Sequence, residues 1–206
     1  PVGLAAAIHE PDALIQILAT VVTGGVLDII GKDRGYCEWI HSRGITWLCL
    51  TPGQFRDVVA EKAEAGTFSS LTHLFIRSRG REKLLPGDVK EWYAAFCTNV
   101  RLVHVYGHVE TGFIDACHFI EESAARSAAV PVGLPVEPSE ILVLDEDLDE
   151  CDDEFAGDIY IKTPRLTAGC VNPEGKAAQF IEDPESEEPG DLLFRTGDTG
   201  RWLEDG

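Results

Sequence analysis

Apolar residues in the first half of the chain alternate between helical and strand-like spacing. The segment "PDALIQILATVVTGG", residues 11–25, opens with Pro-Asp, carries apolar residues at helical intervals and closes on Gly-Gly, which predicts a helix with marked ends. The same reasoning predicts helices over 52–66 and 86–99 and strands over 45–50, 71–78 and 100–107. Repeated units of strand and helix predict a largely parallel sheet with flanking helices.

A Pro-rich stretch, "AVPVGLPVEPSE" at 129–140, marks a change in this pattern. The chain beyond it consists of short apolar runs separated by turns and acidic loops, which predicts strands over 140–145, 157–163, 191–197 and 200–205. We therefore predict an α/β fold class in two parts. A subdomain over 1–132 holds the largely parallel sheet with its flanking helices, and a small distorted β-barrel follows over 133–206.

The balance of charge is strongly acidic, with a formal net charge of −19. A nucleic-acid partner is not expected, because nucleic-acid-binding proteins neutralise phosphates with clustered Lys and Arg. Acidic residues are concentrated in 145–154 and 182–191, and runs of this kind form solvated loops. The first run lacks the loop glycine and the spaced terminal Glu of an EF-hand, so no calcium site is predicted there.

Other features of the composition bear on the cellular setting. No run of residues reaches the roughly 18 apolar positions of a membrane helix, and the N-terminus shows no targeting signal, so a membrane partner is not expected. The six cysteines lie at least 12 residues apart and form no CxxC pair, which is typical of free thiols in a reducing cytoplasm. The sequence contains no methionine, and from this we expect a piece of a longer protein.

Candidate ligand-binding residues lie where the strand over 100–107 ends. Ligands of parallel sheets bind at the carboxyl ends of the strands, which places Tyr106, Gly107 and Glu110 at a ligand-facing edge. A further candidate is Asp198, on a predicted Thr-Gly-Asp corner between two strands, where a carboxylate can hold the hydroxyl groups of a ribose. The structural alternatives are a core aromatic for Tyr106, a helix-start residue for Glu110 and a turn former for Asp198.

Four motifs follow one another along the chain. They are "YGHVE" at 106–110, "VGLPVEPSEILVLDEDL" at 132–148, "GDIYIKTPRLTAGCVNPEGKAAQF" at 157–180 and "FRTGDTGRW" at 194–202. In order and spacing they resemble the motifs of adenylate-forming enzymes, and most closely those of nonribosomal peptide synthetase adenylation domains. The resemblance implies the fold of the later part of that family's large N-terminal domain. It also implies attack of a carboxylate on ATP, giving an acyl adenylate that is then transferred to a carrier thiol.

The resemblance implies a role for each matched residue. Tyr106, next to Gly107, would stack on adenine, and His104 would hydrogen-bond the adenine edge. Asp198 would hold the ribose hydroxyls. Glu110 would hold Mg²⁺ against the phosphates, since magnesium prefers oxygen ligands. The residues implied for the acyl pocket are Asp12, Phe75, Arg77 and Phe113.

Several parts of the family pattern are not matched. The Gly-rich phosphate loop ending in Pro-Lys and the small domain with a catalytic Lys are not found in the 206 residues, and His108 and Val109 stand where Pro and Thr are expected. Few donors would then stabilise the charge that develops on phosphate. The chain alone is therefore predicted to be inactive, with no cofactor bound, whereas ATP and Mg²⁺ are cofactors of the parent family.

The implied acyl pocket departs from the pattern as well. Counting back from Gly24-Gly25 puts Pro11 where amino-acid-activating members have the Asp that pairs with the substrate ammonium, and Asp12 follows one place later. The segment "RSR" at 77–79 replaces a Gly-Gly-Glu turn, so that long side chains stand where the family has backbone only. Arg77 would either fill the pocket or pair with an acidic acyl group, and we favour filling.

These observations lead to three functional hypotheses. The first is a truncated adenylation-like domain of a nonribosomal peptide synthetase or hybrid polyketide/peptide assembly line, inactive alone and kept as a structural or docking remnant. Its partners would be neighbouring synthetase domains, such as the carrier protein and condensation modules, in the cytoplasm. The alternative is an excised segment of an active enzyme that adenylates an amino acid or carboxylic acid and loads a carrier-protein thiol. The third, unrelated hypothesis is an α/β domain that binds a sugar nucleotide or another small molecule.

Overall fold

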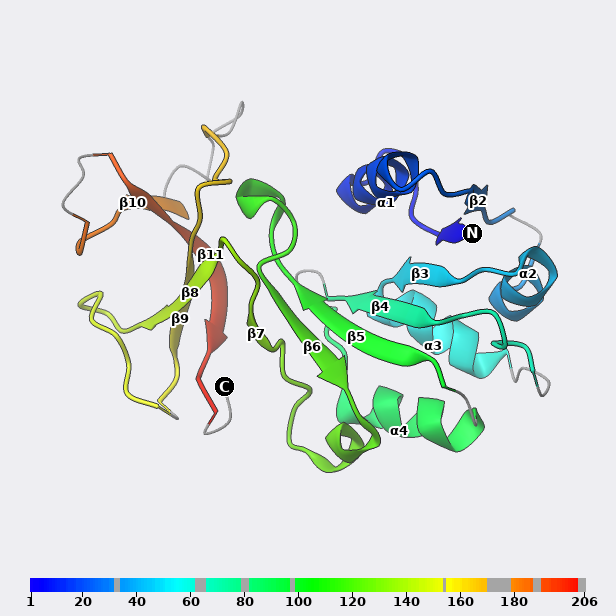
Figure 1. Ribbon diagram of the computed structural model, residues 1–206. Helices are drawn as coiled ribbons and strands as arrows, with labels where there is room; N and C mark the ends of the chain where they lie inside the picture. Colours follow the sequence, from blue (N-terminus) through cyan, green and yellow to red (C-terminus); the bar gives the residue numbers. More distant parts are fainter. Residues whose placement is uncertain are drawn as a thin grey trace. The chain divides into compact units, whose positions relative to one another are not determined.

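The computed structural model describes residues 1–31, 34–61, 66–78, 82–96, 99–153, 155–169, 179–186 and 190–203 (Figure 1). It contains a seven-stranded sheet in the order β2-β1-β3-β4-β5-β6-β7 and a four-stranded sheet in the order β10-β11-β9-β8. The predicted fold class, a largely parallel sheet with flanking helices followed by a small β module, is confirmed. The chain divides into two compact units, Pro1–Val105 with His118–Val132 and Tyr106–Cys117 with Gly133–Gly206. Division of the chain into subdomains at residue 132 stays a prediction.

Neighbouring strands at the centre of the larger sheet are parallel. These strands are β2 (Leu27–Ile29), β1 (Val2–Leu4), β3 (Trp47–Leu50), β4 (His73–Arg77) and β5 (Arg101–Tyr106). Two further strands, β6 (Ala116–Ile120) and β7 (Leu134–Pro135), are antiparallel to each other. Side chains alternate between the two faces of a strand, so Leu74 and Ile76 of β4 face one side and Phe75 and Arg77 the other.

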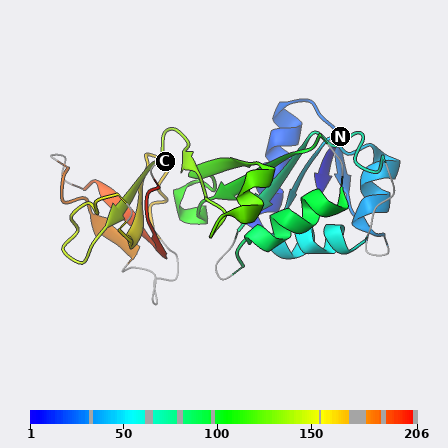
Figure 2. The ribbon, with the colours of Figure 1, turned by 90° about the horizontal axis from the view of Figure 1, so that it is seen from below.

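Helices cover both faces of the parallel strands. Figure 2 shows α1 (Pro11–Val22) on one side and α3 (Pro52–Ala60) and α4 (Pro86–Ala95) on the other. The main core includes residues of α3 and α4, together with α2 (Tyr36–Arg43) and the short 3-10 helix η2 (Glu122–Arg126). Its centre is an aromatic cluster of Phe55, Phe68, Trp92 and Phe96.

Local signals in the sequence explain where these helices begin. The side chain of Thr51 accepts a hydrogen bond from the backbone N–H of Gln54 at 3.3 Å, and Gln54 Oε1 accepts one from the backbone N–H of Thr51 at 2.9 Å. The two bonds form a capping box at the start of α3. At α2, the carboxylate of Glu61 accepts the N–H groups of Tyr36 and Cys37, each at 2.8 Å. An anion at this end satisfies otherwise unpaired donors and complements the helix dipole.

The second unit contains the antiparallel sheet. Its strands are β8 (Glu140–Leu144), β9 (Gly157–Lys162), β10 (Phe180–Glu182) and β11 (Leu192–Gly200). Leu144, Tyr160 and Leu193 form its buried apolar core. In the first acidic run, the Asp145 side chain accepts the backbone N–H groups of Asp147 and Asp149, a turn that presents acidic residues to solvent.

The expectation of two strands around a Thr-Gly-Asp corner is wrong. β11 is a single nine-residue strand, and the motif is a bulge within it. The strand pairs with β9 on both sides of the irregularity, at Arg195 with Tyr160 and at Thr199 with Asp158. Gly197 has a φ of 80°, which lets the chain bulge without ending the strand. Residues 201–203 belong to no strand, and 204–206 lie outside the described residues.

Other predicted elements end earlier than expected. α3 ends at Ala60 and α4 at Ala95, and residues 62–65 and 97–98 lie outside the described part of the chain. Among the described residues the longest helix has 12 residues, and none is long and apolar enough to cross a bilayer.

Candidate functional site

The Tyr-Gly and Thr-Gly-Asp motifs meet in the second unit. Tyr106 ends β5 and Asp198 stands in the bulge of β11, and the Tyr106 hydroxyl donates a hydrogen bond to Asp198 Oδ2 at 3.0 Å across 92 positions of sequence. His108 Nε2 lies 3.2 Å from the Tyr106 hydroxyl and 3.8 Å from Asp198 Oδ2. We call these three residues the clasp.

The bulge turns Asp198 toward Tyr106 and leaves part of it exposed. The backbone N–H of Asp198 donates to Thr196 Oγ1 at 3.1 Å, and that hydroxyl donates to the carbonyl of Ile159 at 2.8 Å. These bonds tie the bulge to β9. The Asp198 side chain is 35% exposed, so a carboxylate oxygen that already accepts one hydrogen bond still has capacity for others.

Burial and the neighbouring carboxylates keep the Tyr106 hydroxyl protonated. Burial is the largest cause that raises the pKa of Tyr106, and the charge of Asp198 and its hydrogen bond raise it further. A protonated phenol is a donor, which suits the bond to Asp198. Since that proton points at Asp198, His108 Nε2 is assigned as a donor to the phenol oxygen.

The loop after Tyr106 is held by a buried carboxylate that sequence reasoning missed. Asp115 is fully buried, and it accepts hydrogen bonds from the hydroxyls of Thr111 and Ser139 and from the backbone N–H of His108. Arg165 Nη2 lies 3.8 Å from Asp115 Oδ1. The only sequence signal is an acidic residue between the apolar Ile114 and Ala116, which predicts a partner if the site is buried.

Two residues of this loop have a restricted backbone. A Cβ at Gly107 would lie 2.4 Å from the carbonyl oxygen of Phe113, so no side chain fits there. Phe113 has a φ of 83°, an unfavourable conformation for a bulky residue, and its N–H donates to the His108 carbonyl at 2.7 Å. The packing of the loop therefore accounts for Gly107 without a ligand, and the pocket role expected of Phe113 stays a prediction.

Glu110 lies in the 3-10 helix η1 (Val109–Thr111), where its carbonyl accepts the N–H of Thr167 at 2.8 Å. In the described part of the chain, no three His, Cys, Asp or Glu residues gather into a metal site. Magnesium in nucleotide sites commonly takes one or two protein carboxylates together with phosphates and water, so a site with Glu110 as its one protein carboxylate fits that chemistry. Its metal role stays a prediction.

Two of the expected pocket residues pair with each other in the first unit. Arg77 ends β4 and Asp12 stands in the first turn of α1, and Arg77 Nη1 lies 2.5 Å from Asp12 Oδ1. Both side chains are buried, at 6% and 9% exposure. Asp12 thus faces inward with a cation already beside it, and Arg77 is directed inward. Their roles in an acyl pocket stay predictions. The ring of Phe75, the third expected pocket residue in this unit, packs on Trp47 at a centroid distance of 4.6 Å.

His104 takes part in a separate internal network. Its Nδ1 lies 2.7 Å from the carbonyl oxygen of Pro131, and its Nε2 lies 2.9 Å from the hydroxyl of Ser78. A carbonyl only accepts, so Nδ1 is assigned the proton and Nε2 accepts from Ser78. Burial lowers the pKa of His104, which favours this neutral form. Both ring nitrogens are engaged, and an adenine contact would require one of these bonds to open.

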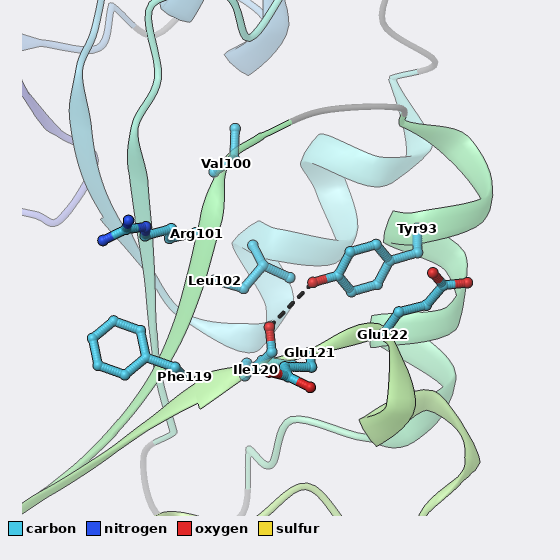
Figure 3. A pocket seen from close by; sticks show the side chains of 8 residues that line it. All are labelled: Tyr93, Val100, Arg101, Leu102, Phe119, Ile120, Glu121 and Glu122. Atoms are coloured by element: carbon cyan, nitrogen blue, oxygen red, sulfur yellow. Dashed lines mark hydrogen bonds between the residues drawn. The ribbon is translucent and has the colours of Figure 1, made fainter.

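A pocket in the first unit lies apart from the expected site residues. Its volume is about 350 Å³, and Figure 3 shows the eight residues that line it: Tyr93, Val100, Arg101, Leu102, Phe119, Ile120, Glu121 and Glu122. The Tyr93 hydroxyl donates to the carbonyl of Ile120 at 3.1 Å. The pocket adjoins the first residues of β5, whereas the candidate ligand residue Tyr106 is the last residue of that strand.

Comparisons with known proteins agree with the motifs. The family model described as AMP-binding enzyme matches residues 4–170. Surfactin synthase subunits 1 and 2 of Bacillus subtilis (strain 168) are 29% and 32% identical over 99% and 93% of this chain, which covers 6% and 5% of their lengths. Glycine betaine reductase ATRR of Emericella nidulans is 27% identical over 93% of this chain, which covers 15% of its length.

Solved structures match over nearly the whole chain. The Klebsiella oxytoca NpsA N-terminal subdomain, in complex with 3-hydroxybenzoyl-AMSN, aligns with a TM-score of 0.81 at 24% identity, over 98% of this chain and 51% of its own. PA1221, a nonribosomal peptide synthetase protein containing adenylation and PCP domains, aligns with a TM-score of 0.82 at 21% identity, over 100% of this chain and 41% of its own.

The family match extends over more than half of the chain. The chain therefore belongs to the AMP-binding enzyme family. It spans a small part of its sequence relatives and about half of these solved structures or less.

Proposed function

We propose that the chain is the ribose-side part of a nucleotide site in an adenylation domain of a nonribosomal peptide synthetase. The observation that carries this proposal is the 3.0 Å hydrogen bond between Tyr106 and Asp198, because it joins two family motifs 92 positions apart. The part-exposed carboxylate of Asp198 suits the two hydroxyls of a ribose, and Tyr106 would hold that carboxylate in place.

Within a complete site, ATP would supply the phosphate that a carboxylate attacks. Glu110 would hold Mg²⁺ against the phosphates, and His104 and Tyr106 would lie on the adenine side. The chain's own contribution is to bind and orient the nucleoside. Catalysis of phosphate chemistry depends on donors aimed at the developing charge, and the motifs for the phosphate loop and the catalytic Lys are not among these residues. The chain alone is therefore inactive.

ATP–pyrophosphate exchange tests this proposal. We expect no exchange with the chain alone, and exchange with a longer protein that contains it if the site is completed there. Asp198→Ala should abolish the exchange of the longer protein. Asp153→Ala is the matched control, because it removes an exposed carboxylate from the same unit. Equal activity of the two variants would contradict the role given to Asp198.

A second candidate function is a structural or docking element among the carrier and condensation domains of a synthetase. The buried pair of Arg77 and Asp12 favours it, because each charge already has a partner where an acyl group would bind. The longer protein could lack exchange activity while it still folds and still associates with neighbouring domains. That result would support this second function over the first.

A further inference from the structure

The loop that follows Tyr106 meets two other segments of the second unit at a buried carboxylate. Asp115 is fully buried, and its Oδ1 accepts the hydroxyl of Ser139 at 2.7 Å, while its Oδ2 accepts the backbone N–H of His108 at 3.3 Å. Neutral donors alone leave a buried negative charge poorly compensated. Arg165 supplies a positive charge, with its Nη2 3.8 Å from Asp115 Oδ1.

Arg165 contacts this network from the segment that follows β9. Its Nη2 donates to Ser139 Oγ at 2.8 Å, so the Ser139 hydroxyl stands between the guanidinium and the carboxylate. The same Nη2 donates to the carbonyl of Ile114 at 2.9 Å. The side-chain stem packs on Gly112, where an added Cβ would lie 3.2 Å from Arg165 Cβ. One side chain therefore contacts the loop at two positions and ties it to the Pro-rich stretch at Ser139.

Further hydrogen bonds extend the network to the clasp and to Glu110. The N–H of Asp115 donates to the Tyr106 carbonyl at 2.9 Å, and the Tyr106 hydroxyl donates to Asp198 at 3.0 Å. The N–H of Thr167 donates to the Glu110 carbonyl at 2.8 Å. A continuous set of contacts thus joins residues from all four motifs of the sequence.

Stability alone does not explain such a network, because desolvation largely offsets the attraction between charges that are taken out of water. A satisfied polar network instead fixes one arrangement of the groups that it joins. Tyr106 and Glu110 belong to the loop and its start, whereas Asp198 belongs to β11. These three residues can act on one ligand only if the loop keeps its place against the strand.

We propose that Arg165 is a positioning residue of the nucleotide site. Through Ser139 and Asp115 it holds the loop that carries Tyr106 and Glu110 in a fixed place. The role in nucleotide binding rests on the proposed function, whereas the ordering of the loop by Arg165 does not.

Amide hydrogen exchange of the chain, followed by NMR, tests the ordering of the loop. Arg165→Gln removes the cation but keeps a polar side chain, and the N–H groups of Asp115 and Thr167 should then exchange at least about tenfold faster. Amides in the ladder between β8 and β9 should stay within about twofold of their wild-type rates, because the opening is local. Arg195→Gln is the matched control, since it removes a half-exposed arginine of the same unit that pairs with Asp158, and it should leave all of these rates unchanged.

Unchanged exchange at Asp115 and Thr167 in Arg165→Gln would overturn the inference. An equal increase in the β8–β9 ladder would overturn it too, because that pattern indicates that the whole unit has lost stability. If Arg165→Gln does not fold, Ser139→Ala takes its place, since it removes the hydroxyl between Arg165 and Asp115 without altering a charge. The same local increase then supports the inference, and no increase contradicts it.

ATP–pyrophosphate exchange of a longer protein that contains the chain tests the role in nucleotide binding. Arg165→Gln should raise the KM for ATP about tenfold and change kcat by less than about twofold, because it displaces binding groups and removes no donor to the reacting phosphate. Arg165→Lys, which retains the charge, should recover most of this loss. A fall in kcat at unchanged KM would contradict the positioning role. If the wild-type longer protein shows no exchange, the proposed function fails, and the hydrogen-exchange result still decides whether Arg165 orders the loop.

Discussion

Two carboxylates of this chain stand in contrasting surroundings. Asp198 in the second unit is 35% exposed, and its hydrogen bond comes from the neutral hydroxyl of Tyr106. Asp12 in the first unit is buried, and its partner is the guanidinium of Arg77 at 2.5 Å. A neutral donor leaves the charge of Asp198 available to a ligand. A buried cation neutralises Asp12, so the pair needs no ligand to complete it.

The contrast between Asp198 and Asp12 separates two roles of a carboxylate, ligand binding and internal charge pairing. A part-exposed carboxylate costs little to desolvate and retains accepting capacity, whereas a buried charge requires its partner at all times. Loss of a partner should therefore affect folding in the first unit and ligand binding in the second.

The largest effect is expected for Asp12→Ala, which leaves the Arg77 cation buried without this carboxylate. We expect the free energy of unfolding to fall by about 3–5 kcal/mol, measured by urea denaturation. Arg43→Ala, which breaks the exposed pair with Asp28, is the matched control and should cost at most about 1 kcal/mol. Equal losses in the two variants would show that the Asp12 pair is not closed to solvent.

A double replacement sharpens the same point. Asp12→Val/Arg77→Met removes both charges and keeps apolar volume, so we expect its stability to lie within about 1 kcal/mol of the wild-type value. A loss as large as that of Asp12→Ala would mean that the pair itself, and not the burial of an uncompensated charge, determines stability.

An intermediate effect is expected from His104, which belongs to the same closed unit. Burial holds the pKa of His104 below its ordinary value of 6.5, against the opposing effect of the bond to Pro131. As the pH falls below 6.5 the unfolded chain takes up a proton that the folded chain does not. The free energy of unfolding should therefore decrease until the pH reaches the folded-state pKa, with no contribution above 6.5.

The measurement is urea unfolding between about pH 8 and about pH 5. His104→Gln keeps hydrogen-bonding atoms but does not titrate, so its stability should fall less over the lower half of this range. Parallel curves for the two proteins would exclude His104 as the cause of the acid sensitivity.

The smallest effect on folding is expected at the clasp. Asp198→Ala removes the acceptor of the Tyr106 hydroxyl, but the site is partly exposed and His108 remains nearby, so we expect a loss of about 1 kcal/mol or less. The control Asp153→Ala should stay within about 0.5 kcal/mol of the wild-type value. A loss above about 3 kcal/mol would place Asp198 with Asp12, as a structural residue.

Sequence patterns predicted some of these features and missed others. The helix over α1 was predictable from Pro-Asp, apolar spacing and Gly-Gly, and the motifs placed Tyr106 and Asp198 together. α2 was missed because "YCEWIHSR" has no clear apolar periodicity and depends for its start on Glu61, the residue after α3. The strand expected to begin at Gly200 was wrong because pairing with β9 continues β11 through the bulge.

The pairing of Asp12 with Arg77 likewise could not be predicted from local sequence patterns. The two residues are 65 positions apart, and each is an ordinary charged residue at the end of a predicted element. Only the assembled sheet brings the start of α1 to the end of β4. The sequence predicted that Arg77 points inward, because the segment over 77–79 replaces a Gly-Gly-Glu turn of the family. It did not predict which residue pairs with Arg77.

Titration calorimetry of this chain with MgATP tests most directly whether the clasp is one part of a larger nucleotide site. Two or three polar hydrogen bonds at about 1–2 kcal/mol each, with one aromatic contact, scarcely offset the cost of association. The net charge of −19 further disfavours a polyanionic ligand. We expect no binding tighter than about millimolar. A micromolar dissociation constant that Asp198→Ala abolishes would contradict this, because it would show that the clasp binds nucleotide without the rest of the site.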